Sequence, residues 1–150
     1  MKMNDSFKYN STNEIAFRYL MILYITEAQK NTDELAIFDF LTIYSKAFGI
    51  GEYNLHGNNE YNVSEYTARR AQAEEAIRML VLKGLVDVAD QEDGRFFAIS
   101  VEGISVCDRL TTAYAANYMS TAYLVDDYIG NKSADKLIAF ITKDSLKNRR

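Results

Sequence analysis

The chain has 150 residues, a formal net charge of −4 and 48% hydrophobic residues, which fits one compact domain with a substantial core. Its single cysteine, Cys107, cannot form an internal disulfide, so a disulfide scaffold is excluded and a reducing compartment such as the cytoplasm is favoured. We expect neither a signal peptide nor a membrane contact. The N-terminus lacks a long apolar segment, and the run Tyr19–Ile25 is far shorter than the roughly 20 residues of a membrane span.

Two helices with capping signals are predicted at the start of the chain. Ser11, with Glu three residues later, predicts a helix that ends near Gln29. Asn31, again followed by Glu at the third position, predicts a second helix that ends near Phe48. Large apolar side chains lie on nearly every side of both helices. Such helices must be buried on every side.

A polar segment, Gly49–Val63, follows and contains His56, the only histidine. Loops of this length are uncommon in compact domains unless they are functional or disordered. We expect Leu55 to anchor the loop and His56 to pin it to the start of the third helix, with partner contacts by both residues as the alternative. The third helix is predicted over Ser64–Lys83, and Gly84 suits its C-terminal end.

A β-hairpin is predicted next, with strands at Leu85–Asp90 and Arg95–Ser100 and a turn at Gln91–Gly94. A helix followed by a two-stranded hairpin is the second half of a winged helix-turn-helix, a fold best known for DNA binding. The tip of this hairpin carries three carboxylates, Glu92 and Asp93 among them, where a DNA-binding wing normally carries basic residues. We therefore predict a winged helix that contacts protein through Glu92 and Asp93.

Helices are also predicted after the hairpin. Ser100 caps the first of these, a second reaches Ile129, and a third is expected to end near Lys143. The stretch 110–125 has no charged residue but is rich in Thr, Tyr, Asn and Ser. Tyr114 and Tyr118 are of the amphipathic aromatic type that is enriched at protein interfaces, so we predict that they bind a partner.

The predicted fold class is mainly α (α+β), with a winged helix-turn-helix core, a hairpin wing and C-terminal helices. We assign residues 1–150 to a single domain, with a core at about 9–110, a helical extension at 111–143 and a basic tail at 144–150. A domain of this size has difficulty covering the first two helices and the uncharged helix at 110–125 by itself. We therefore predict that a partner covers part of them; an efficiently packed monomer is the alternative.

Direct DNA binding is a weaker interpretation. Arg69 and Arg70 lie in the N-terminal half of the third helix, where a recognition helix contacts bases and phosphates. However, the segment 64–83 has four basic and three acidic residues, and the segment 84–110 has two basic and six acidic ones. The strong positive patch that DNA-binding proteins need is not found in these segments.

Catalysis and metal binding receive no support from the sequence. His56 and Cys107 are the one possible nucleophile–base pair, but Cys107 lies in an apolar helical pattern typical of a buried, inert thiol. One histidine and one cysteine do not fill a four-ligand zinc site, and the sequence has neither a Walker loop nor a dinucleotide fingerprint. We predict no catalytic, cofactor-binding or metal-binding residue.

The ordered combination of several segments resembles a known family. These segments are Tyr9–Arg18, Asn54–His56, Arg69–Arg70 and Lys83–Val88. In this order they are similar to the middle component of the prokaryotic ABC three-component systems, which include the Lamassu anti-phage systems. The likeness spans about Tyr9–Leu110.

The resemblance implies a small, non-catalytic adaptor in an anti-phage complex. Its partners would be an SMC/Rad50-like ATPase, which alone would bind ATP and Mg²⁺, and an effector that is often a nuclease. The adaptor would keep the effector inactive until foreign DNA is sensed, its own DNA contact would be indirect or weak, and a homo-oligomer is possible. The alternative is a stand-alone winged-helix transcription regulator that dimerises through the helix at 110–129 and uses Arg69 and Arg70 on DNA.

Overall fold

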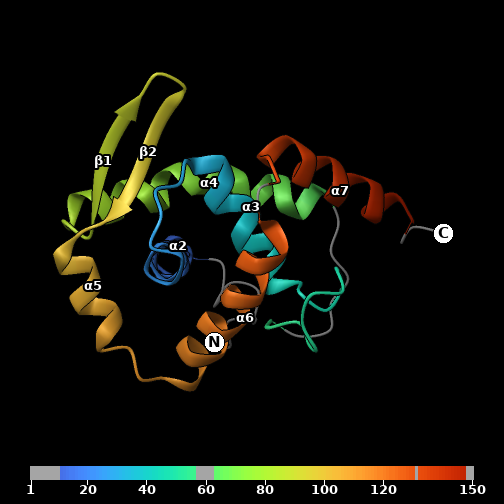
Figure 1. The fold of residues 1–150 in the computed structure, drawn as a ribbon, viewed down its shortest axis with the longest axis horizontal. Helices are drawn as coiled ribbons and strands as arrows, with labels where there is room; N and C mark the ends of the chain where they lie inside the picture. The colour runs from blue at the N-terminus through green and yellow to red at the C-terminus, as the bar shows by residue number, and fades with distance from the viewer. Residues whose placement is uncertain (1–10, 57–62, 131, 148–150) are drawn as a thin grey trace, which may run out of the picture.

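The computed structural model describes residues 11–56, 63–130 and 132–147, which form six helices and one antiparallel hairpin. The fold is mainly helical with a small β part, as predicted. In chain order the elements are α2 (Thr12–Thr26), α3 (Thr32–Ile43), α4 (Val63–Leu82), β1 (Val86–Gln91), β2 (Gly94–Ile99), α5 (Val101–Asp108), α6 (Ala113–Ile129) and α7 (Ala134–Lys147). Seen end-on in Figure 1, α2 lies at the centre with the other elements arranged around it.

The predicted caps start the helices. Ser11 accepts a hydrogen bond from the Glu14 N–H, and Ser100 caps α5 in the same way. Asn31 and Glu34 form a complete capping box, in which each side chain accepts a hydrogen bond from the other residue's backbone N–H. These local bonds satisfy N–H groups that the first turn of a helix leaves without a partner, which is why the starts follow the sequence closely.

The end of α3 differs from the prediction. The helix ends at Ile43, whereas the sequence predicted an end near Phe48. The side chain of Asn54 explains part of the difference, because its Oδ1 accepts hydrogen bonds from the backbone N–H groups of Lys46 and Ala47. A side-chain acceptor that arrives from the following loop competes with the helical pattern of backbone bonds.

The expectation that a domain of this size has difficulty covering its apolar helices alone is wrong for α3 and for most of α2. Helix α2 packs against α3, α4, α5 and α6, and its residues 15–23 are buried within this chain except Phe17, which is 38% exposed. Helix α3 is buried in the same way, between α2, α4, α6 and α7. Only α6 has a large exposed apolar pair, Tyr123 and Leu124, among these three helices.

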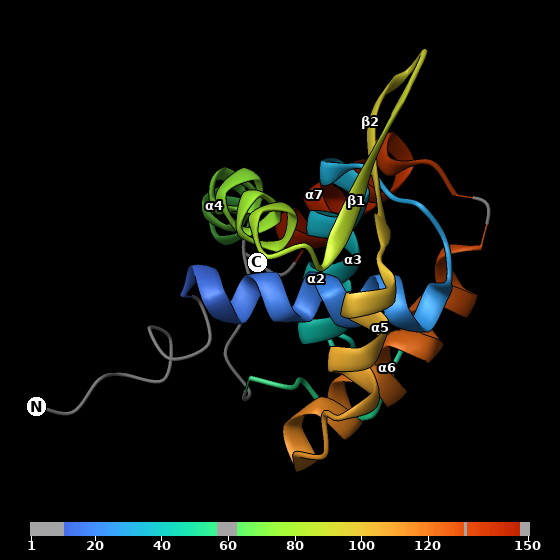
Figure 2. The ribbon, with the colours of Figure 1, turned by 90° about the vertical axis from the view of Figure 1, so that its left-hand side faces the viewer.

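The hairpin joins β1 and β2 in a regular register, in which Val88 pairs with Phe97, through a two-residue turn that precedes Gly94. It is tied to the helices by a bridge that the sequence did not predict. The N–H of Lys30 donates to the carbonyl of Phe97 at 3.1 Å, and the N–H of Phe97 donates back to the carbonyl of Lys30 at 2.9 Å. The linker between α2 and α3 thus pairs with the outer edge of β2, while the rest of the hairpin projects away from the helices (Figure 2).

The last helix is longer than predicted. We expected an end near Lys143 and a basic tail from residue 144, but α7 continues to Lys147; residues 148–150 of the predicted tail lie outside the described part. Leu137 and Ile141 of α7 are buried in the common core, so α7 packs on the same core as α3. Among the residues that the structure describes, no helix combines the length and apolar character that a membrane crossing needs.

Candidate functional site

A buried ion pair joins the two central helices. Arg18 of α2 donates from Nε to Asp39 Oδ1 at 2.8 Å and from Nη2 to Oδ2 at 3.1 Å, and both side chains are almost completely buried. Burial alone would raise the pKa of Asp39, but the charge and hydrogen bonds of Arg18 outweigh it and hold that pKa below its usual value. The pair is therefore ionised in the interior of the protein.

Tyr118 attaches α6 to this ion pair. Its hydroxyl donates to Asp39 Oδ1 at 2.5 Å, and the side chain is fully buried. Burial first, and then the negative charge of Asp39, raises the pKa of Tyr118, so the hydroxyl remains a donor. The sequence predicted a partner contact for Tyr118. The structure instead places its whole surface inside this chain, where it satisfies a buried carboxylate.

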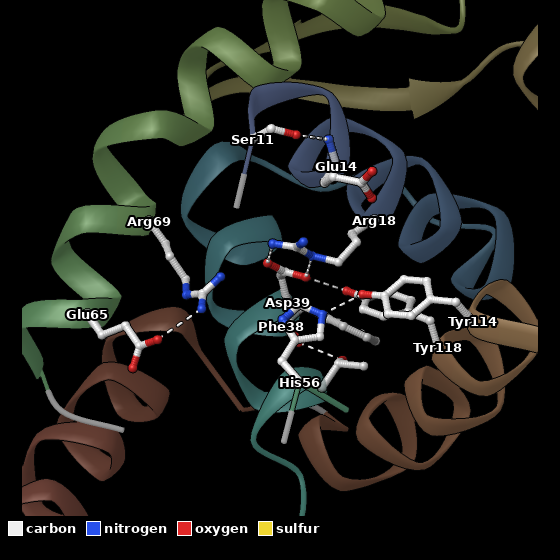
Figure 3. A network of polar contacts seen from close by, with 11 residues as sticks. Ser11, Glu14, Arg18, Phe38, Asp39, His56, Glu65, Arg69, Tyr114 and Tyr118 are labelled. Carbon is white, nitrogen blue, oxygen red and sulfur yellow. Dashed lines mark hydrogen bonds and ion pairs between the residues drawn. The ribbon is translucent and has the colours of Figure 1, made fainter. Parts of the chain in front are cut away.

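His56 and Tyr114 extend the network toward the loop after α3. His56 Nε2 lies 2.6 Å from the Tyr114 hydroxyl oxygen, and the two rings stack with centroids 5.7 Å apart. Tyr114 in turn stacks on Tyr118 with centroids 6.2 Å apart. Three of the predicted partner-binding residues therefore lie side by side (Figure 3). They come from two parts of the chain that the sequence alone did not bring together.

The role of His56 follows from this geometry. We expected it to pin the loop to the start of the third helix; it does pin the loop, but to α6. Burial first, and then the positive charge of Arg18, lowers the pKa of His56 to about 3, so the ring is neutral near pH 7. Leu55 packs against the core beside it and its N–H donates to the carbonyl of Ile43, which confirms the expected anchor.

The two arginines of the alternative DNA-binding interpretation form ion pairs within the chain. Arg69 is buried and donates from Nη2 to Glu65 at 2.9 Å, one turn earlier on α4. Arg70 is more exposed and donates from Nε to Asp33, in the first turn of α3, at 2.6 Å. Arg69 would have to leave its buried position to contact a phosphate, whereas the side chain of Arg70 is partly exposed.

The hairpin tip is acidic and exposed, as its sequence indicated. Glu92 and Asp93 form the turn, and both are exposed. Arg95, the basic residue of β2, donates from Nε to Asp90 across the hairpin at 2.9 Å. This pair balances its own charges, so the tip remains negative.

Chemistry-bearing groups are few in the described part of the chain. Cys107 is buried on α5, and burial raises the pKa of its thiol to about 12, so it is protonated near pH 7. His56, the other member of the possible nucleophile–base pair, is hydrogen-bonded to Tyr114 of α6. Within residues 11–56, 63–130 and 132–147, no cluster of three or more His, Cys, Asp or Glu side chains has the arrangement of a metal site.

Sequence reasoning missed Asp39, although a signal was present. Arg18 is the only charged residue between Ile15 and Ile25, and Asp39 is the only one between Leu35 and Tyr44. A single charge of opposite sign in each of two fully apolar helices predicts that the two charges meet, because a buried charge needs a partner.

A family model described as "ABC-three component (ABC-3C) system Middle Component 2" matches residues 8–149. The chain belongs to this family. Its place as a middle component implies an adaptor role in a system of several subunits, with other components of that system as partners. Comparison with curated proteins gave no match, and neither did comparison with solved structures.

Several of the segments that resemble the family contribute a residue to the polar network of this middle component. Arg18, His56 and Arg69 each come from one of those segments, and all three are drawn in the polar network of Figure 3. Arg18 joins α2 to α3, His56 joins the loop after α3 to α6, and Arg69 is bonded to Glu65 within α4. Outside this network, large apolar side chains are exposed at Val88 on the hairpin, Ile104 on α5 and Tyr123 on α6.

Proposed function

We propose that this middle component is a non-catalytic adaptor of an anti-phage system of the Lamassu type, lying between an SMC/Rad50-like ATPase and an effector that is a nuclease. The observation that carries the proposal is the family match over residues 8–149. ATP and Mg²⁺ would be bound by the ATPase. The adaptor would dock the effector and hold it inactive until foreign DNA is engaged.

A winged-helix core is part of the proposal. The order α2, α3, α4 and hairpin is that of a winged helix, and the pairing of Lys30 with Phe97 adds an isolated bridge at the edge of β2. In a DNA-binding member the hairpin would neutralise phosphates. The exposed carboxylates of Glu92 and Asp93 favour a basic protein surface instead.

The polar network supports an adaptor in another way. A subunit that positions two others needs faces held in a fixed relative orientation. The bonds among Arg18, Asp39 and Tyr118 connect α2, α3 and α6 across the centre of the molecule, and a buried charged network is costly to rearrange. The outer surfaces of these helices therefore move together.

Co-expression with the proteins encoded beside this chain tests the function. We expect the middle component to co-purify with an ATPase and an effector in a complex of defined mass. Alone, it should bind duplex DNA weakly. Co-purification with neither protein would contradict the adaptor role. Tight, site-selective binding to its own promoter with a steep salt dependence would identify a transcription regulator instead.

The hairpin is tested within the same complex. We expect Glu92→Lys with Asp93→Lys to weaken co-purification, because it reverses the charge of the tip. Glu74→Lys with Glu75→Lys is the matched control, since it changes the net charge equally and both side chains are exposed on α4. If both double variants co-purify like the wild type, the hairpin is not a docking surface, and the adaptor role itself is unaffected.

A further inference from the structure

A groove separates α5 from α6 above the C-terminal end of α2. Its volume is about 570 Å³, and the end of β2 and the residues after α2 complete its walls. Figure 1 shows α5 and α6 on different sides of α2, which is seen end-on between them. Both helices pack on α2. The apolar side chains that line the groove include Tyr24, Ile25, Ile99, Ile104 and Tyr123.

Part of this apolar lining is exposed. Ile104 on α5 is 40% exposed and Tyr123 on α6 is 60% exposed, and Tyr24 and Ile25 at the end of α2 are half-buried. Large apolar side chains gathered in a concave site commonly mark a binding surface, because removing them from water is favourable. The groove volume lies within the range of roughly 300–1,000 Å³ that is typical of ligand sites.

The charged side chains that line the groove are all negative among the described residues. The described residues that line it include two carboxylates, Glu27 and Asp108, and neither Lys nor Arg. Both carboxylates stand at helix C-termini, where the backbone carbonyls add negative potential. The Tyr24 hydroxyl donates to Asp108 at 2.5 Å and joins the floor of the groove to α5. Arg109, the next residue, directs its Nε to the carbonyl of Ser105 and does not line the groove.

We propose that this groove docks an amphipathic, basic segment of another subunit of the three-component system. Apolar side chains of that segment pack on Ile104 and Tyr123, and a Lys or Arg pairs with Glu27 and Asp108. This inference rests on the proposed adaptor function. A second copy of this chain fits less well because it has a net charge of −4, and duplex DNA is repelled by the same carboxylates.

The apolar contact is tested with Ile104→Glu in the co-expressed complex. We expect about tenfold weaker binding or more, because a buried anchor of this kind contributes a large part of the binding energy. Val101→Glu is the matched control: it lies on the same helix, is 80% exposed and does not line the groove. Equal thermal unfolding of the two variants shows that both are folded. Equal loss of binding in both variants would overturn the proposal.

The charge contact and the occupant are tested separately. We expect Glu27→Lys to weaken binding at low salt, with a difference from the wild type that shrinks as salt is raised. A photo-crosslinking amino acid in place of Tyr123 should react with a Lys- or Arg-containing peptide of one partner subunit. A crosslink to a second copy of this chain would overturn the proposal, and so would an assembled complex without any crosslink from this position. Both results would leave the adaptor function intact, whereas failure of the wild type to assemble would contradict both.

Discussion

Replacing Asp39 by Asn tests whether the buried ion pair stabilises the fold. The substitution keeps the shape of the side chain but removes its charge, which leaves the Arg18 guanidinium almost completely buried beside a neutral amide. Removal of one partner of a buried pair costs about 3–5 kcal/mol. A domain of this kind has a free energy of unfolding of about 5–15 kcal/mol, so Asp39→Asn should remove a large share of it.

Urea unfolding followed by circular dichroism measures this loss. We expect the midpoint of Asp39→Asn to fall with an unchanged dependence on urea concentration. The comparison is the triple variant Arg18→Met, Asp39→Leu and Tyr118→Phe, which removes all three polar partners together. Because no polar group of the triad then remains buried without a partner, this variant should lie within about 2 kcal/mol of the wild type.

The dependence on pH provides a second measurement. Arg18 holds the folded pKa of Asp39 below its unfolded value, so the stabilisation is complete above the unfolded pKa and is lost as pH falls through the folded pKa. The wild type should therefore lose stability below about pH 4, whereas Asp39→Asn should lack this part of the acid transition. A loss of less than about 1 kcal/mol for Asp39→Asn, or a triple variant no more stable than the single one, would refute this account.

Three further predictions concern the loop after α3 and helix α5. The ring of His56 should remain neutral in an NMR titration down to about pH 3, and a transition near 6.5 in the folded state would contradict its burial. Because only the unfolded chain takes up this proton, the free energy of unfolding should fall as pH drops below about 6.5. Tyr114→Phe should cost about 1 kcal/mol in urea unfolding through loss of the bond to His56, and a neutral result would show that this bond adds nothing. Gly103→Ala should destabilise the protein by about 1–3 kcal/mol, because the added Cβ would lie 2.2 Å from the backbone oxygen of Leu85; Glu102→Ala, at an exposed position one residue earlier, is the control and should be nearly neutral.

The local features of this fold were accessible from the sequence. The capping side chains of Ser11, Asn31 and Ser100 act within three residues of their own position, and each starts a helix where it was predicted to. The hairpin was accessible for the same reason, since its turn lies between two short apolar runs that pair directly. Such features depend on short-range geometry, which a single sequence specifies well.

The features that were missed depend on distant parts of the chain. Tyr118 meets Asp39 across 79 residues, and His56 meets Tyr114 across 58. The extent of burial was misjudged for a related reason. A sequence shows how much apolar surface a helix has, but it does not show which other segments of the same chain will cover that surface. Here α4 and α6 both pack against α2 and bury most of it within this chain.

The double backbone bond between Lys30 and Phe97 has a mechanical consequence for the projecting ribbon. It clamps the base of the ribbon to the short connection between the two innermost helices, so bending there would require both bonds to break. Beyond this clamp, the side chain of Gln91 makes a further tie, because its Nε2 donates to Gln29 Oε1 at 2.6 Å. A force applied at Glu92 and Asp93 would be transmitted through these bonds to the linker that precedes α3.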